Sequence, residues 1–267
     1  MALFEYQFLQ HAVLASLLAS VVCGVVGVLI VEKKLVMMSG GIAHTAYGGV
    51  GLGYLCGFVP LLGAMLFAVG AALGIGVMRR KSGKDSDVVI ALFWSLGMAL
   101  GILFTSMMGG YPPDMNSYLF GNILSVTSGD LLLMTVLTLL VLLVIFLFFE
   151  DWKTFLFDED FAKVAGMPVS LLENVLLVLI ALSIVVLIRV AGIILVIALL
   201  TAPASCAALF TRRLKSRMGL AVAFCLFFTL VGLALSYLLN LSSGAVIIIL
   251  SVVTYFLLRL LPERKRA

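Results

Sequence analysis

The stretch Val190–Phe210, which reads VAGIILVIALLTAPASCAALF, contains no charged side chain. Its length is close to the ~20 residues that a helix needs to cross a hydrocarbon layer of ~30 Å. Four more uncharged runs of comparable length occur in the chain, at Ala12–Val31, Leu131–Phe149, Met218–Leu239 and Gly244–Leu258. This repetition predicts a polytopic, all-α membrane protein.

The composition supports the same fold class. Hydrophobic residues make up 64% of the 267 residues and charged residues 11%, against roughly 45–50% and about 25% in soluble domains. The leader Met1–His11 has no Lys or Arg, so it lacks the positive region of a signal peptide and we expect the first run to be a transmembrane helix. The cysteines show no C-x-x-C spacing and are expected to act as small apolar residues: Cys23, Cys56, Cys206 and Cys225.

Polar breaks divide the chain into a bundle of eight or nine spans that form one transmembrane domain over residues 1–267. The nine candidate spans are 10–31, 35–56, 61–78, 87–108, 130–149, 170–188, 190–210, 218–239 and 244–260. All but one of the 17 Lys and Arg residues follow alternate spans, and therefore lie on one side of the membrane. The positive-inside bias predicts an external N-terminus and a cytoplasmic C-terminus. The net charge of +4 thus reflects topology and gives no indication of a nucleic-acid partner.

Arg189, between the sixth and seventh spans, is the basic residue outside this pattern. It can extend to the interface or pair inside the bundle, and we expect the interface position first.

The second span, SGGIAHTAYGGVGLGYLCG at Ser39–Gly57, is rich in glycine. Small residues spaced by four allow helices to pack closely in a membrane. His44 is an ionisable group at membrane depth, where such groups are mostly functional, and imidazole suits zinc-like ions. It is therefore a candidate metal ligand; the alternative is a histidine that hydrogen-bonds to a neighbouring carbonyl. Two stripes run along the span, Gly49 with Gly53 and Gly57, and beside them Gly40, His44 and Gly48.

Two further segments depart from plain membrane helix. Pro203 lies inside the seventh span, where it can serve as a gating bend or a packing kink. The loop Glu150–Pro168 reads EDWKTFLFDEDFAKVAGMP, with acidic residues that can cap a short helix and Gly166 suited to its C-terminal end. Phe161, Val164 and Ala165 give this helix a small apolar face, which a soluble partner can grip unless the loop is only a connector.

Several activities lack their motifs. The chain has no G-x-x-x-x-G-K-[ST] loop for ATP, no H-E-x-x-H and no G-x-S-x-G, so we expect a transport subunit and not an enzyme. Embedded carboxylates are scarce, with Glu173 the main candidate near the inner surface. This scarcity disfavours a carrier driven by protons or sodium, because such a carrier needs a buried acid.

Five segments in matching order resemble the permease subunits of the ABC importers for zinc, manganese and iron, whose fold is similar to that of the vitamin B12 importer permease. They are SGGIAHTAYGG at Ser39–Gly49, SYLFGNIL at Ser117–Leu124, FDEDFAKVAGMP at Phe157–Pro168, AGIILVIALLTAPASCAALF at Ala191–Phe210 and SSGAVIIIL at Ser242–Leu250.

The resemblance implies a multi-pass protein of the plasma (inner) membrane that works as a pair of identical subunits and holds no cofactor. Each copy would bind a cytoplasmic ATP-binding subunit, which hydrolyses ATP, and receive the divalent metal ion from an extracytoplasmic metal-binding protein. His44 would contact the metal, and a cytoplasmic coupling helix at about 158–168 would dock on the ATPase. The implied coupling residues are Asp160, Phe161, Ala162, Ala165, Gly166 and Met167.

Two residues depart from the family pattern. Gly40 replaces the aspartate that commonly stands four residues before the histidine, and Ser242 replaces the proline of the P-S-G-A element. Loss of a carboxylate favours ions that prefer nitrogen, so zinc is the expected cargo, with manganese or iron as alternatives. The rival functions are a secondary metal carrier driven by an ion gradient, with no ATPase partner, and a membrane scaffold or enzyme. The helix at 158–168 is explained only by the ABC importer.

Overall fold

A computed structural model describes residues 7–82, 86–109, 118–119, 121 and 123–260. All regular structure in these residues is helical, as the sequence predicts. Seven helices are long and apolar enough to cross a membrane: Gln7–Glu32, Pro60–Arg80, Asp87–Ser106, Ser128–Leu147, Val169–Ala208, Leu214–Leu239 and Ser243–Leu260. The chain divides into two compact units, one formed by residues 1–33, 119–144 and 186–267 and the other by residues 34–118 and 145–185.

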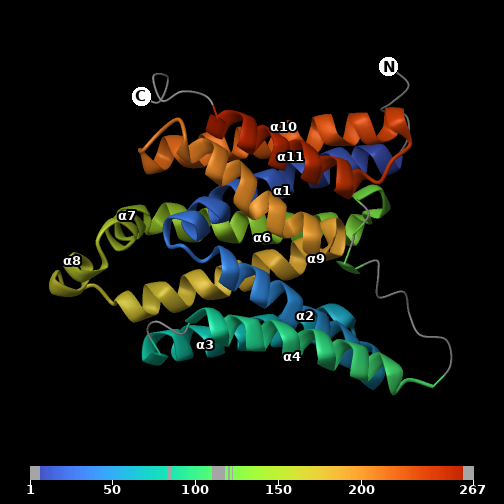
Figure 1. Ribbon diagram of the computed structural model, residues 1–267, viewed down its shortest axis with the longest axis horizontal. Coiled ribbons are helices and arrows are strands. Elements are labelled where there is room, and N and C mark those ends of the chain that lie inside the picture. Colours follow the sequence, from blue (N-terminus) through green and yellow to red (C-terminus); the bar gives the residue numbers. More distant parts are fainter. Residues whose placement is uncertain (1–6, 83–85, 110–117, 120, 122, 261–267) are drawn as a thin grey trace. The chain divides into compact units, whose positions relative to one another are not determined.

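The first unit is built around α1 (Gln7–Glu32) and α10 (Leu214–Leu239), which lie side by side (Figure 1). A methyl group added at Gly24 would lie 2.7 Å from Cα of Val222, so the two backbones are nearly in contact. The hydroxyls of Ser20 and Thr229 lie 3.4 Å apart across the same interface. Small residues thus permit close helix packing without a hydrophobic driving force. The unit also contains η3 (Ile123–Ser125), α11 (Ser243–Leu260), and parts of α6 (Ser128–Leu147) and α9 (Val169–Ala208).

Helix α9 spans 40 residues but is interrupted at Gly192, where φ is 76° and ψ is 161°. This conformation favours glycine and divides α9 into two helical parts, which correspond to the predicted spans 170–188 and 190–210. A methyl group at Gly121 would lie 2.3 Å from the Ala191 carbonyl oxygen. The backbone at Gly121 therefore lies directly against the interruption.

Arg189 pairs with Asp130 at the start of α6, and its place at the interface stays a prediction. Its Nε atom lies 2.5 Å from Oδ1 of Asp130, a carboxylate whose side chain is only 8% exposed. Oδ2 of Asp130 accepts hydrogen bonds from the backbone N–H and the hydroxyl of Thr127, at 3.0 and 2.6 Å. Thr127 accepts a return bond from the Asp130 N–H, as in a capping box. A carboxylate placed for capping therefore also supplies the partner that the arginine needs.

The second unit is built around α2 (Val36–Cys56), which packs against α3 (Pro60–Ser82) and α4 (Ser86–Ser106) (Figure 1). Methyl groups at Gly49 and Gly53 would lie 2.1 Å from the Gly63 carbonyl oxygen and 2.6 Å from Cα of Pro60. These two glycines pack helices together, as the stripe predicts. Gly57 instead ends α2 in the left-handed conformation at φ 73° and makes no such contact.

Helix α2 is not among the seven apolar helices, although its bounds match the predicted span 35–56. The mean hydropathy of α2 is lowered by its glycines, its tyrosines and His44. Between Met38 and Gly51 every residue except His44 is buried, so α2 is covered by protein and need not be apolar enough to face lipid. This helix and the two parts of α9 account for the difference between seven helices and the nine predicted spans.

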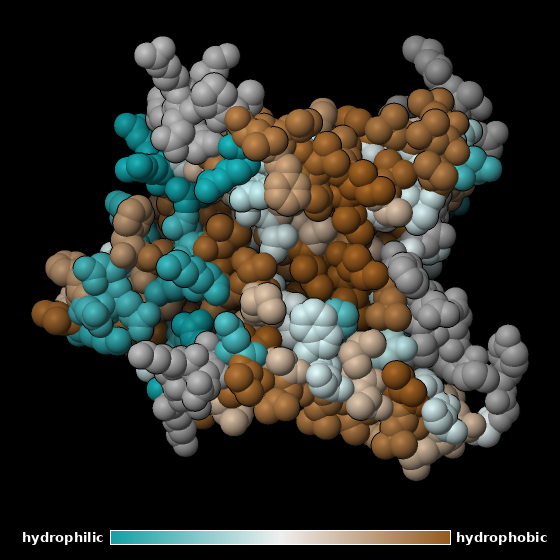
Figure 2. All heavy atoms as spheres, viewed as in Figure 1, coloured by the Kyte–Doolittle hydropathy of each residue, from teal (hydrophilic) through white to brown (hydrophobic). Residues whose placement is uncertain are grey.

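The second unit also contains α7 (Phe149–Phe157), α8 (Glu159–Val164) and the first part of α9. Trp152 and Phe155 anchor α7 through buried aromatic side chains. Figure 2 shows hydrophilic side chains gathered over the α7–α8 segment and apolar ones along α3 and α4. This distribution suits an aqueous position for α7–α8 and a lipid-facing position for α3 and α4.

Candidate functional site: an imidazole in α2 and an exposed helix at α8

His44 lies on α2, and its half-buried side chain projects toward α4. The imidazole stacks on the indole of Trp94, with ring centroids 4.1 Å apart and planes inclined by 12°. Its Nδ1 atom lies 3.4 Å from Sδ of Met98, one turn further along α4. The ring therefore contacts a thioether, and not the backbone carbonyl that we considered as a structural partner.

The backbones of α2 and α4 approach closely beside these side chains. A methyl group at Gly97 would lie 2.3 Å from Cα of Thr45, and one at Gly48 would lie 2.7 Å from the Gly97 carbonyl oxygen. The Thr45 hydroxyl donates a hydrogen bond of 3.0 Å to the carbonyl of Phe93. Gly48 of the predicted second stripe thus packs against α4. Gly40 is also buried.

The polar surroundings of His44 contain little negative charge. Within the described part of the chain, no group of three or more His, Cys, Asp and Glu residues could hold a metal ion. Two acidic side chains inside the predicted spans are bound elsewhere: Asp130 to Arg189, and Glu173 to Arg79 and Arg80. Imidazole nitrogen and thioether sulfur are therefore the donors that the structure brings together at this place.

The α8 segment forms as the sequence predicts. The Asp158 side chain caps the helix by accepting a 2.9 Å hydrogen bond from the Phe161 N–H. At the other end Gly166 has φ 78°, its N–H bonds to the Lys163 carbonyl, and the Met167 N–H bonds to the Ala162 carbonyl. This pair of bonds is a Schellman motif, which favours glycine at the left-handed position.

The exposed face of α8 consists of apolar side chains on a charged segment. Phe161 is 61% exposed and Val164 is 87% exposed, and Ala165 is exposed beside them. Ala162 is fully buried, so its predicted place on the coupling face is corrected: its methyl group packs inward against the protein. Met167 is half-buried, and Asp160 is exposed next to Lys163.

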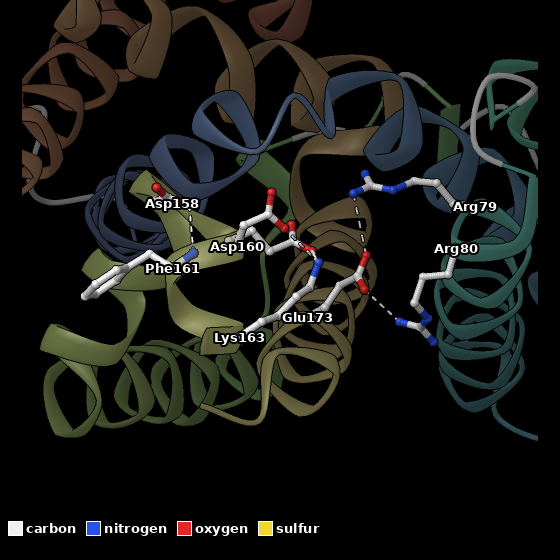
Figure 3. A network of polar contacts seen from close by, with 8 residues as sticks. Arg79, Arg80, Asp158, Asp160, Phe161, Lys163 and Glu173 are labelled. Atoms are coloured by element: carbon white, nitrogen blue, oxygen red, sulfur yellow. Dashed lines mark hydrogen bonds and ion pairs between the residues drawn. The ribbon is translucent and has the colours of Figure 1, made fainter. Parts of the chain in front are cut away.

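Two sets of charged groups interact in the second unit, one within α8 and one between α3 and α9 (Figure 3). Lys163 lies 3.2 Å from Glu159 and 3.4 Å from Asp160, and hydrogen bonding to the Glu159 carboxylate, followed by its charge and the Asp160 carboxylate, raises the pKa of Lys163. Arg80 Nη1 lies 2.8 Å from Glu173 Oε2 and also donates to Asn174, at 3.1 Å. Glu173 thereby ties the end of α3 to the start of α9.

Pro203 is buried in the second part of α9. The helix departs from helical dihedral angles at Gly192 and not at Pro203. A gating role for Pro203 thus stays a prediction. Residues 117, 120 and 122 of the motif at Ser117–Leu124 lie outside the described residues, as do Lys84 and the basic residues at 264–266.

Sequence reasoning missed Trp94 and Met98 as neighbours of His44. Their spacing of four places them on one face of α4, but the sequence does not say that this face meets α2. It also missed the pairing of Glu173 with Arg79 and Arg80, because the partners are far apart in the chain.

Long apolar helices, a buried glycine-rich helix that carries an imidazole, and an exposed apolar face on a charged segment define a polytopic membrane protein of the transporter class. The family model described as "ABC 3 transport family" matches residues 5–261. The chain belongs to this family.

Individual relatives agree with this assignment. The chain is 43% identical over 253 residues to an uncharacterised membrane protein of Synechocystis sp., covering 95% of this chain and 90% of the relative. It is 33% identical to the manganese transport system membrane protein MntC of Listeria monocytogenes, covering 96% and 91% of the two chains. Among solved structures, PsaBC from Streptococcus pneumoniae in complex with Fab matches with a TM-score of 0.88 and 30% identity, over 99% of this chain and 95% of that one.

Proposed function

We propose that the chain is the permease of an ATP-driven importer that carries divalent transition-metal ions into the cytoplasm. Membership of the ABC 3 transport family and the manganese-transport name of a 33% identical relative support this function. The observation that carries it is His44, the residue left half-exposed on an otherwise buried stretch of a glycine-rich helix. Glycine-interrupted spans of this kind mark binding sites in transporters.

Zinc is the proposed cargo, with manganese as the competing ion. The relative's name favours manganese. Manganese prefers oxygen ligands, whereas imidazole suits zinc. Gly40 supplies no carboxylate one turn from His44, and the described residues contain no group of three or more His, Cys, Asp and Glu side chains that could hold a metal ion. The donor chemistry of this chain therefore favours zinc.

The exposed face of α8 is the proposed docking site for a cytoplasmic ATP-binding subunit. Phe161 and Val164 place apolar area in water, which costs free energy unless a partner covers it. By the same proposal the α7–α8 segment is cytoplasmic, the N-terminus is external, two copies form the pathway, and an external metal-binding protein delivers the ion.

A carrier driven by an ion gradient is the weaker alternative. Such a carrier needs an acidic group that is free to take up and release the driving ion. Asp130 and Glu173 are both engaged by arginine side chains. Neither is therefore available as a relay in the structure.

Reconstitution tests the proposal. The chain is co-expressed with an ATP-binding subunit and an external metal-binding protein of this transporter class, placed in proteoliposomes, and assayed for uptake of radioactive zinc and manganese. We expect uptake that requires ATP and the binding protein. Uptake that follows an imposed proton or sodium gradient without ATP would establish the carrier instead, and no metal uptake under either condition would overturn the proposed function.

A further inference from the structure

The separation between His44 and Met98 fits a shared metal ion. In zinc sites the metal lies ~2.0–2.1 Å from a histidine nitrogen and ~2.3 Å from a cysteine sulfur, so a tetrahedral ion holds a nitrogen and a sulfur donor ~3.6 Å apart. Nδ1 of His44 and Sδ of Met98 lie 3.4 Å apart. An ion could bind both donors with little movement of either side chain.

Backbone contacts hold the two donors in this relation. Thr45 and Gly97, the chain neighbours of His44 and Met98, are so close that a methyl group at Gly97 would lie 2.3 Å from Cα of Thr45. Trp94 covers one face of the imidazole and restricts its rotation. The pair is therefore positioned by the packing of α2 on α4 and not by the flexible methionine side chain alone.

Neither donor side chain is fully covered by the rest of the chain. His44 and Met98 are half-buried, whereas the intervening residues Thr45 and Gly97 are buried. A methionine that only filled the helix interface would be expected among the buried residues. Two protein donors leave the remaining coordination positions to water, and such incomplete coordination suits an ion that must also leave the site.

We infer that Met98 is a second ligand and a specificity-determining residue, and that its sulfur and the His44 nitrogen together receive the transported ion and select zinc over manganese. Thioether and imidazole donors favour soft or borderline ions, and manganese prefers oxygen. This inference rests on the proposed function. Its rival is a structural role in which the weakly accepting thioether only orients the imidazole through a hydrogen bond.

Three variants separate these roles. Met98→Leu keeps the volume of the side chain and removes the sulfur. Met98→Gln offers a harder oxygen donor at similar length. Met107→Leu makes the same exchange at an exposed methionine just beyond the end of α4 and is the matched control. Zinc binding to the purified complex is measured by calorimetry, and uptake is measured with zinc and manganese in competition.

We expect Met98→Leu to lower zinc affinity at least about tenfold, since loss of even an outer partner of a metal ligand costs 10–100-fold. The zinc-to-manganese uptake ratio should fall similarly, with manganese uptake retained, while Met98→Gln shifts the ratio further toward manganese and Met107→Leu leaves it unchanged. X-ray absorption of the zinc-loaded wild-type complex should show a sulfur neighbour, independently of how any variant folds.

Three results would overturn the inference. If zinc uptake is lost in His44→Asn while Met98→Leu keeps the wild-type ratio, Met98 is structural and the proposed function stands. If the zinc spectrum of the wild-type complex contains no sulfur neighbour, Met98 is not a ligand. A wild-type complex that neither binds nor imports zinc contradicts both the inference and zinc as cargo, and its manganese uptake then shows whether the importer function itself survives.

Discussion

At the scale of single residues, the ionisable side chains in the predicted spans are of two kinds: carboxylates that form ion pairs with arginine, and an imidazole with no described ion pair. Asp130 and Glu173 are each neutralised by arginine, which reduces the cost of placing a charge near hydrocarbon. His44 has only aromatic and thioether contacts among the interactions described. A neutral imidazole of this kind can offer a lone pair to a metal ion. This contrast separates residues that stabilise the fold from the residue proposed to meet the cargo.

Substitution of His44 should abolish metal uptake without disturbing assembly. His44→Ala removes the nitrogen donor from a helix otherwise packed through glycines, and His44→Asn keeps hydrogen-bonding capacity but is a poor ligand for zinc. Both variants should insert, bind the ATPase and fail to import metal in the uptake assay. Normal uptake by His44→Asn would make the histidine structural.

In the wild-type background, Gly40→Asp should shift the metal preference of uptake toward manganese, because it adds a carboxylate one helical turn from His44.

Removal of Arg189 should destabilise the first unit, because Asp130 would be left as a nearly buried charge. Loss of one partner of a fully buried pair costs ~3–5 kcal/mol. Arg189 is 42% exposed, so we expect about 1–3 kcal/mol for Arg189→Met. The double variant with Asp130→Asn should recover part of this loss in thermal unfolding of the detergent-solubilised protein. Equal stability of Arg189→Met and wild type would show that the pair is not formed in solution.

At the scale of elements, α8 is a helix of only six residues. A helix of this length is not stable as an isolated peptide, so contacts at its ends and on its inner side must stabilise it. The Asp158 cap, the Schellman motif at Gly166 and the buried Ala162 methyl fix its two ends and its inner side. What remains outside is an apolar face presented in a defined orientation.

Gly166→Val should reduce binding of the ATP-binding subunit while the permease stays folded. Valine is strained at φ 78°, by at least ~1–2 kcal/mol, although no atom lies within 4 Å of a methyl group placed there. Gly70→Val is the matched control, because Gly70 also has open space around it but lies in ordinary helix. Co-purification of the ATPase should fall only for Gly166→Val. An equal yield with both variants would indicate that the segment is merely a connector.

Much of this element structure could be predicted from the sequence, because membrane helices and their ends are local features. The start of α8 at Asp158, its end at Gly166 and the bounds of α2 required only composition, spacing and capping rules. The features that the sequence did not predict depend on tertiary packing. The inward orientation of Ala162, the pairing of Arg189 with Asp130, and the meeting of Met98 with His44 depend on which helices pack together, and no local pattern specifies that choice.

At the scale of the whole molecule, the alternating placement of basic residues predicts the sidedness of every loop. The described helices retain the predicted order of spans, with α9 supplying two of them across Gly192. Omission of a single span would reverse the side of all later loops. The proposed cytoplasmic position of α8 therefore depends on the helix count as well as on its own chemistry.

Cysteine labelling tests this topology directly. Ser82→Cys, at the end of α3, should resist a membrane-impermeant reagent added outside intact cells and react after permeabilisation. Native Cys56 is exposed and lies at the other end of the α2–α3 region, whereas Cys23, Cys206 and Cys225 are buried. Cys56 should therefore react from outside and serve as the internal control, with Cys56→Ser as the background for Ser82→Cys. External labelling of Ser82→Cys would invert the layout.

Among the predicted spans, helix α2 is the one that is not apolar enough to be expected to enter a bilayer alone. Its glycines, tyrosines and imidazole contribute little to partitioning during synthesis, and it falls outside the set of strongly apolar helices. Its backbone is instead shielded by α3 and α4 through contacts such as Gly49 with Gly63 and Gly48 with Gly97. The nascent chain must therefore retain α2 beside the translocation machinery until its two neighbours have been made. We therefore expect α2, α3 and α4 to insert into the membrane together. A ribosome that stalls after Cys56 would leave α2 without a stable place in the membrane.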